Sequence, residues 1–170
     1  MNWTIFLLMS SIIWMPALCT ILFNIVFSLI PAPKWFLYYL APGVILHELS
    51  HALATILMGQ TITDFHPFQL PSPDGTMGYV THAYNPVSLK DQLIGNGLIS
   101  LAPAYVLGGI VVSLFYGSIH HNMICLNLLL IFGLSLLNGM RLSSADWHGA
   151  KWSILFWFIL SYIVSKCLYI

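Results

Sequence analysis

The segment His47-Glu48-Leu49-Ser50-His51 is the part of this sequence in which residue types and spacing together suggest a reaction. On a helix, positions four residues apart share a face, so the imidazoles of His47 and His51 can reach one metal ion. Glu48 lies beside the first histidine and can act as general base toward a water on that ion. The pattern therefore predicts a zinc hydrolase site on a helix.

The composition of the chain places this site in a membrane. Of the 170 residues, 59% are hydrophobic and 6% are charged, and five basic side chains balance five acidic ones. Because soluble domains carry about 25% charged residues, we expect the chain to lie in a lipid bilayer rather than in the cytosol. The net charge of zero offers no basic surface for nucleic acid. We therefore expect no nucleic acid among its partners. We also expect no nucleotide, because a nucleotide-binding domain does not fit in this length.

Glu48 is the only glutamate in the chain, and it falls near the middle of an apolar run. An ionisable residue at membrane depth costs about 2.5–3.5 kcal/mol on insertion scales, so such residues are usually functional. The alternative is that these polar side chains only hydrogen-bond one another between helices. That structural role would not require two histidines and a glutamate in this register.

The apolar segments predict an all-α polytopic membrane protein that forms a single domain over residues 1–170. About 20 apolar residues cross the hydrocarbon core, and we expect five transmembrane helices, at 3–30 (with a kink at Pro16), 35–58, 93–116, 122–140 and 152–170. Between the second and third helices, β-branched and aromatic residues flank a turn sequence at 71–75, which predicts a β-hairpin over 61–84 at the membrane face. Three basic residues fall on the N-terminal side of the membrane (Lys90, Arg141, Lys151) and two on the other side (Lys34, Lys166), which favours a cytoplasmic N-terminus.

A catalytic zinc ion usually has three protein ligands and an open position for water. The candidates for the third ligand are the other acidic residues and two histidines: Asp64, Asp74, Asp91, Asp146, His82 and His148. Asp146 is favoured because it lies in a polar interlude, residues 141–151, between two apolar segments. Irregular backbone at membrane depth occurs where it lines a cavity or is buried in protein. His82 and His148 are the main alternatives.

The motifs of this sequence resemble those of a known family, the site-2-protease-type intramembrane zinc metalloproteases. Val44-Ile-Leu-His-Glu-Leu-Ser-His-Ala-Leu-Ala54 is similar to the family's HExxH motif. Asn138-Gly-Met-Arg-Leu-Ser-Ser-Ala-Asp146 keeps the Asn-to-Asp spacing of its Asn-x-x-Pro-x-x-x-Leu-Asp-Gly motif, and Leu101-Ala-Pro-Ala-Tyr105 resembles its Gly-Pro-containing helix. Arg141, Ala145 and Trp147 replace the second motif's Pro, Leu and Gly. The resemblance covers most of residues 35–150 and indicates a divergent, minimal member.

The resemblance implies that His47, His51 and Asp146 hold Zn²⁺ and that Glu48 activates a zinc-bound water. The chain would then be an endopeptidase that cleaves a membrane-spanning or membrane-adjacent polypeptide. Asn138 is the candidate donor to the developing oxyanion, although a capping or interhelical hydrogen bond is an equally good interpretation of this residue. The hairpin could hold an unwound substrate strand by main-chain pairing, or serve only as a lid or connector.

Two other functions are compatible with the same residues. One is a non-proteolytic zinc-binding membrane protein, such as a sensor or an inactive scaffold. The other is a metal transporter, which is disfavoured because a permeation path usually carries several polar clusters. This chain shows one such cluster within its apolar segments.

Overall fold

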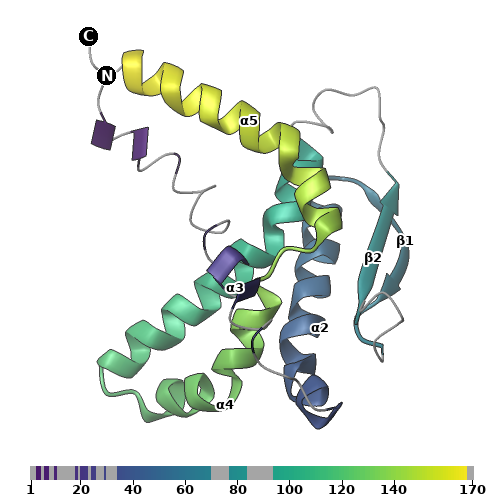
Figure 1. The fold of residues 1–170 in the computed structure, drawn as a ribbon, viewed down its shortest axis with the longest axis vertical. Coiled ribbons are helices and arrows are strands. Elements are labelled where there is room, and N and C mark those ends of the chain that lie inside the picture. Colours follow the sequence, from purple (N-terminus) through teal and green to yellow (C-terminus); the bar gives the residue numbers. More distant parts are fainter. Residues whose placement is uncertain are drawn as a thin grey trace.

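The computed structural model describes residues 34–69, 77–83 and 94–167, together with scattered positions between residues 3 and 29. The elements follow in the order α2 (Lys34–Leu57), β1 (Thr61–His66), β2 (Tyr79–Ala83), α3 (Asn96–Ile119), α4 (Met123–Gly139) and α5 (Ser144–Cys167). Helices α2, α3 and α4 pack against one another, and the two strands lie beside α2 (Figure 1). Helix α5 packs on α3 and then extends away from the other helices (Figure 1).

Three of these helices are long and apolar enough to cross a membrane, over Trp35–Leu57, Asn96–Ile119 and Ser144–Cys167. Helix α4 is apolar but shorter, with 17 residues. Large apolar side chains point outward, and Leu57, Val112 and Leu130 are each at least 67% exposed. Because soluble proteins rarely present broad apolar surfaces, this is consistent with a membrane protein. The expected first helix, with Pro16, falls largely outside the described residues.

The predicted hairpin is confirmed. Strands β1 and β2 pair antiparallel, with Thr61 opposite Ala83 and His66 opposite Tyr79. A glycine directs the chain from α2 into β1, because Gly59 adopts a φ of 72° that closes the helix end. The turn expected at 71–75 lies outside the described residues.

Small residues let the helices approach closely, as is common in membrane bundles. A Cβ on Gly139 of α4 would overlap the Gly43 carbonyl of α2, and one on Gly97 of α3 would overlap the Ser153 side chain of α5. These contacts place the end of α4 against the middle of α2, and the first half of α5 against the start of α3. The segments that carry His47 and Asp146 are thereby brought together.

The predicted start of the last helix is wrong. Helix α5 begins at Ser144, within the polar segment 141–151, rather than at residue 152. The physical reason is a capping box. The Asp146 N–H donates to Ser143 Oγ at 3.1 Å, and the Ser143 N–H donates to Asp146 Oδ2 at 2.7 Å. The polar residues that resemble a loop are the first turns of a helix. Helix α3 also begins and ends later than predicted, at Asn96 and Ile119.

Candidate metal centre

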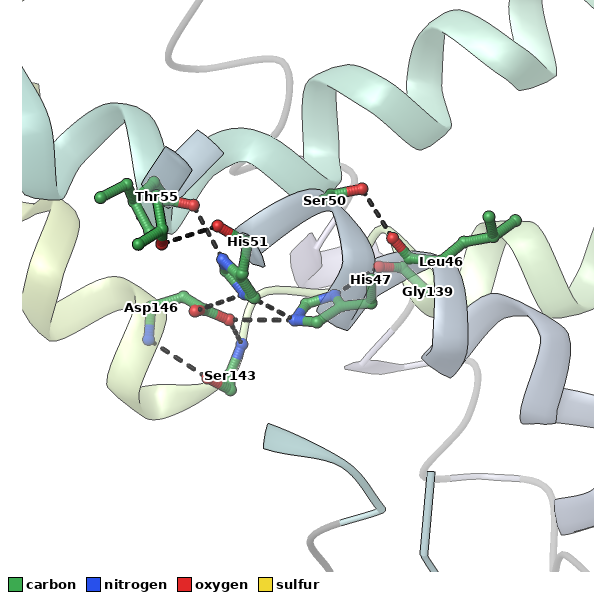
Figure 2. A network of polar contacts seen from close by, with 9 residues as sticks. Leu46, His47, Ser50, His51, Thr55, Gly139, Ser143 and Asp146 are labelled. Atoms are coloured by element: carbon green, nitrogen blue, oxygen red, sulfur yellow. Dashed lines mark hydrogen bonds and ion pairs between the residues drawn. The ribbon is translucent and has the colours of Figure 1, made fainter. Parts of the chain in front are cut away.

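Three side chains from two helices converge on one point (Figure 2). The Nε2 atoms of His47 and His51 are 3.0 Å apart. Asp146 Oδ1 lies 3.1 Å from His51 Nε2, and Asp146 Oδ2 lies 3.5 Å from His47 Nε2. Nitrogen and oxygen ligands about 2.0–2.1 Å from a tetrahedral zinc ion are about 3.3 Å from one another. The three buried ligand atoms therefore have the separations that such an ion requires.

The other ring nitrogen of each histidine is held by a main-chain carbonyl. His47 Nδ1 lies 2.6 Å from the Gly139 oxygen, and His51 Nδ1 lies 2.8 Å from the Ile99 oxygen. Because a carbonyl oxygen can only accept, each Nδ1 carries a proton and donates it. In a neutral imidazole the Nε2 atom is then an unprotonated acceptor. Both Nε2 lone pairs thus face each other and a carboxylate, which is the supporting arrangement typical of metal-binding histidines.

The carbonyl that holds His47 depends on the close contact between α2 and α4. Gly43 lies one helical turn before His47, and a Cβ on Gly139 would overlap its backbone, while a Cβ on Gly43 itself would overlap the Ser135 carbonyl. Ser135 reinforces this contact, because its hydroxyl accepts the Gly43 N–H at 2.8 Å and donates to the Leu40 carbonyl at 3.0 Å. Main-chain packing therefore sets the orientation of the first histidine.

The capping box of α5 orients the third ligand. The same Asp146 Oδ2 that accepts the Ser143 N–H is the oxygen that faces His47. The second oxygen faces His51. The N-terminus of a helix also favours a negative charge. The carboxylate is thus fixed in place by α5 itself, and its two oxygens divide between the two histidines.

Glu48 is 7% exposed and lies on α2 next to His47. Its carboxylate is close enough to both histidines and to Asp146 to interact with them electrostatically. Gly78, just before β2, packs directly over it. A Cβ at this position would lie 2.9 Å from Glu48 Cγ and 3.0 Å from the Pro67 carbonyl oxygen. Nothing in the sequence distinguishes Gly78 from the other glycines, so this contact could not be predicted.

A cavity of about 560 Å³ opens beside the cluster, between β2 and the first turns of α3 and α5. His51 and Asp146 form part of its wall, and Val80 and His82 contribute from β2. Asn96, at the start of α3, also lines it. The Oδ1 atom of Asn96 is buried and has no hydrogen-bond partner among the described residues. A buried acceptor of this kind costs about 1–3 kcal/mol unless something donates to it.

The two alternative histidines line the same cavity but are not part of the converging group. Burial lowers the pKa of His82 below that of an ordinary histidine, and repulsion from His51 acts in the same direction, while the influence of the Asn96 side chain opposes both. His148 lies on α5, two residues after Asp146. Within the part of the chain that the structure describes, Asp146 is therefore the residue that joins His47 and His51.

The remaining acidic candidates differ in their surroundings. Asp64 lies on the exposed face of the hairpin, where Tyr79 Oη donates to its Oδ2 at 3.0 Å and His66 Nε2 is 3.4 Å from its Oδ1. This hydrogen bond raises the pKa of Tyr79. Asp74 and Asp91 lie outside the described residues.

Asn138, the expected oxyanion donor, lies near the end of α4 and does not line the cavity. Its Oδ1 accepts a hydrogen bond from Arg141 Nη1 at 3.3 Å. Arg141 Nε also donates to Asn24 Oδ1 at 2.7 Å, so this side chain connects the end of α4 to the N-terminal segment. A catalytic role for Asn138 stays a prediction, and its neighbour Gly139 acts on His47 through the main chain.

No family model, curated protein or solved structure matches the chain. Figure 2 shows the feature of this chain that is most informative about function, a two-histidine motif on α2 that meets a carboxylate from α5.

Proposed function

We propose that this protein is a multi-pass, zinc-dependent intramembrane endopeptidase of the site-2-protease type. Its substrate would be a membrane-spanning or membrane-adjacent polypeptide. The observation that carries the proposal is the convergence of His47, His51 and Asp146, with Glu48 buried beside them. Two imidazoles and one carboxylate leave an open position on a tetrahedral ion, as in catalytic rather than structural zinc sites.

In the proposed hydrolysis, a zinc ion would activate the water and Glu48 would transfer its proton. Held by His47, His51 and Asp146, a zinc ion would lower the pKa of a coordinated water to about 7 and polarise a carbonyl group. Glu48 accepts a proton from the attacking water and returns it to the nitrogen of the leaving amine. Because Glu48 and the ligands are buried, the surrounding low dielectric strengthens each of these electrostatic interactions.

The hairpin supports a role in substrate binding. Among the described residues β2 pairs only with β1, and Val80 and His82 of β2 line the cavity beside the cluster. An unwound polypeptide could add to β2 by main-chain hydrogen bonds and pass the cavity in an extended conformation. A peptide bond in a helix must lose its internal hydrogen bond before water can attack it, and pairing with a strand would stabilise the opened form.

The test uses the purified full chain in liposomes, loaded with zinc and supplied with labelled β-casein (an unfolded chain) and with labelled transmembrane peptides. Glu48→Gln should keep one zinc per chain and lose at least about 100-fold in turnover, as expected for loss of a general base. Asp64→Asn is the matched control, because it removes an exposed carboxylate away from the cluster. It should cleave like the unmodified protein.

Each outcome decides between the candidate functions. Cleavage that persists in Glu48→Gln would refute the enzymatic proposal. A protein that holds zinc but cleaves nothing would favour the non-proteolytic sensor or scaffold. A protein that holds no stoichiometric metal after zinc loading would refute both.

A further inference from the structure

His82 and Asn96 are polar side chains in the wall of the cavity that also contains His51 and Asp146. They come from different elements, β2 and the first residue of α3. Neither belongs to the converging ligand group. The pair therefore lines the cavity without belonging to the candidate ligand group.

Two features indicate that this pair binds a polar group. The first is the buried Asn96 Oδ1, which has no hydrogen-bond partner among the described residues and so calls for a donor from outside them. The second is the place of His82 in the sheet. It pairs with Ile62 next to an irregularity in the register between Ile62 and Asp64. Such bulges often re-aim side chains beside active sites.

We propose that His82 and Asn96 form the peptide-binding subsite of the metal centre, in which His82 donates to the scissile carbonyl oxygen and Asn96 Oδ1 accepts a main-chain N–H of the substrate. This inference rests on the proposed function. A peptide group supplies one donor and one acceptor, and the pair offers the complementary set. A neutral imidazole has one N–H to donate.

The step balances without a further reagent. The water oxygen forms a bond to the carbonyl carbon, the carbonyl π pair moves to the oxygen, and the water proton goes to Glu48. The His82 N–H stabilises the new oxyanion. When the C–N bond breaks, the electron pair leaves with nitrogen, Glu48 returns its proton to the amine, and the carbonyl re-forms. Donors of this kind act most strongly where charge develops in the transition state.

The kinetic test compares four variants on labelled β-casein. His82→Ala should lower kcat on the order of 100- to 1,000-fold, as loss of one oxyanion donor does, with zinc content unchanged. His82→Gln keeps an N–H donor and should recover part of this loss. Asn96→Ala should mainly raise KM. The matched control is His66→Ala, which removes a histidine from the same hairpin outside the cavity and should leave kcat unchanged.

A binding measurement supplies a readout independent of turnover. The probes are a phosphinic tetra-alanine, which has a tetrahedral anionic phosphorus in place of one carbonyl, and its all-amide counterpart. His82→Ala should weaken the phosphinic peptide selectively, whereas Asn96→Ala should weaken both. If His82→Ala cleaves casein and binds the phosphinic peptide like the unmodified protein, or if it loses zinc as Asp146→Asn does, the inference is overturned. If the unmodified protein itself neither cleaves nor binds, the proposed function has failed, and this inference fails with it.

Discussion

Substitution of Gly139 by alanine tests whether helix packing controls the metal centre. The new Cβ would overlap the Gly43 carbonyl and lie 3.0 Å from Gly43 Cα, so α4 and α2 must move apart. The Gly139 carbonyl, which accepts the His47 Nδ1 proton at 2.6 Å, would move with α4. His47 would then lose the group that fixes its tautomer and its orientation.

The size of the effect follows from the group that is displaced. Loss of a hydrogen bond that supports a metal ligand typically lowers metal affinity 10- to 100-fold, which corresponds to about 1.4–2.7 kcal/mol. A glycine-to-alanine change also favours a helix by about 1 kcal/mol. Gly133→Ala is the matched control for this gain. It lies on the same helix, and its new Cβ would have its nearest neighbour, Leu129 Cδ1, at an ordinary 3.7 Å.

The assay is a competition titration of zinc against a chromophoric chelator in detergent, with helix content checked by circular dichroism. Gly139→Ala should show the 10- to 100-fold loss, while Gly133→Ala binds zinc like the unmodified protein. A folded Gly139→Ala variant with unchanged zinc affinity would refute the reasoning. An equal loss in Gly133→Ala would refute it as well, because a Cβ at that residue would contact only Leu129 of its own helix.

Four shorter predictions concern the same centre. In the same titration, Asp146→Asn should weaken zinc binding by more than the 10- to 100-fold expected for a supporting group. Its effect should also exceed that of His148→Ala. A larger effect of His148→Ala would reassign the third ligand. Ser143→Ala removes the hydroxyl that accepts the Asp146 N–H and should lower the free energy of unfolding by about 1 kcal/mol, measured by denaturant titration. Gly78→Ala should lower kcat while zinc content stays constant, because a Cβ would press on Glu48 Cγ; unchanged kcat would show that the hairpin tolerates the shift. A chelator should lower the melting temperature of the unmodified protein, since an ion at 100 times its Kd stabilises by about 2.7 kcal/mol, and it should have little effect on Asp146→Asn.

The spacing of His47 and His51 was sufficient to place both imidazoles on one face of a helix, and the structure places them there. Asp146 was favoured because it lies in a polar interlude between two apolar segments, and the structure places it beside both histidines. Its backbone was not predicted correctly. Polar composition was interpreted as irregular structure, although the Ser143-to-Asp146 spacing is that of a capping box and is visible in the sequence.

The rest of the site depends on main-chain groups, which leave little trace in a sequence. The carbonyls of Gly139 and Ile99 hold the two histidines, but any residue type supplies a carbonyl. Their positions follow from how α3 and α4 pack on α2, which depends on contacts between residues about 90 positions apart, such as Gly43 and Ser135. The approach of Gly78 to Glu48 is of the same kind.

The hydrogen-bond pattern weighs against the view that the two histidines only join helices. A histidine that only joins helices through Nδ1 would have a hydrogen-bond donor or solvent at its unprotonated Nε2. Here Nδ1 of both His47 and His51 is already committed to a carbonyl. The two Nε2 atoms face each other and Asp146 within 3.0–3.5 Å. A proton on one Nε2 could be donated to the other Nε2 or to Asp146, but it would leave the unprotonated Nε2 facing a carboxylate oxygen with no hydrogen between them. One divalent cation would satisfy all three ligand atoms at once. This asymmetry supports the proposed zinc site more strongly than the HExxH pattern does alone.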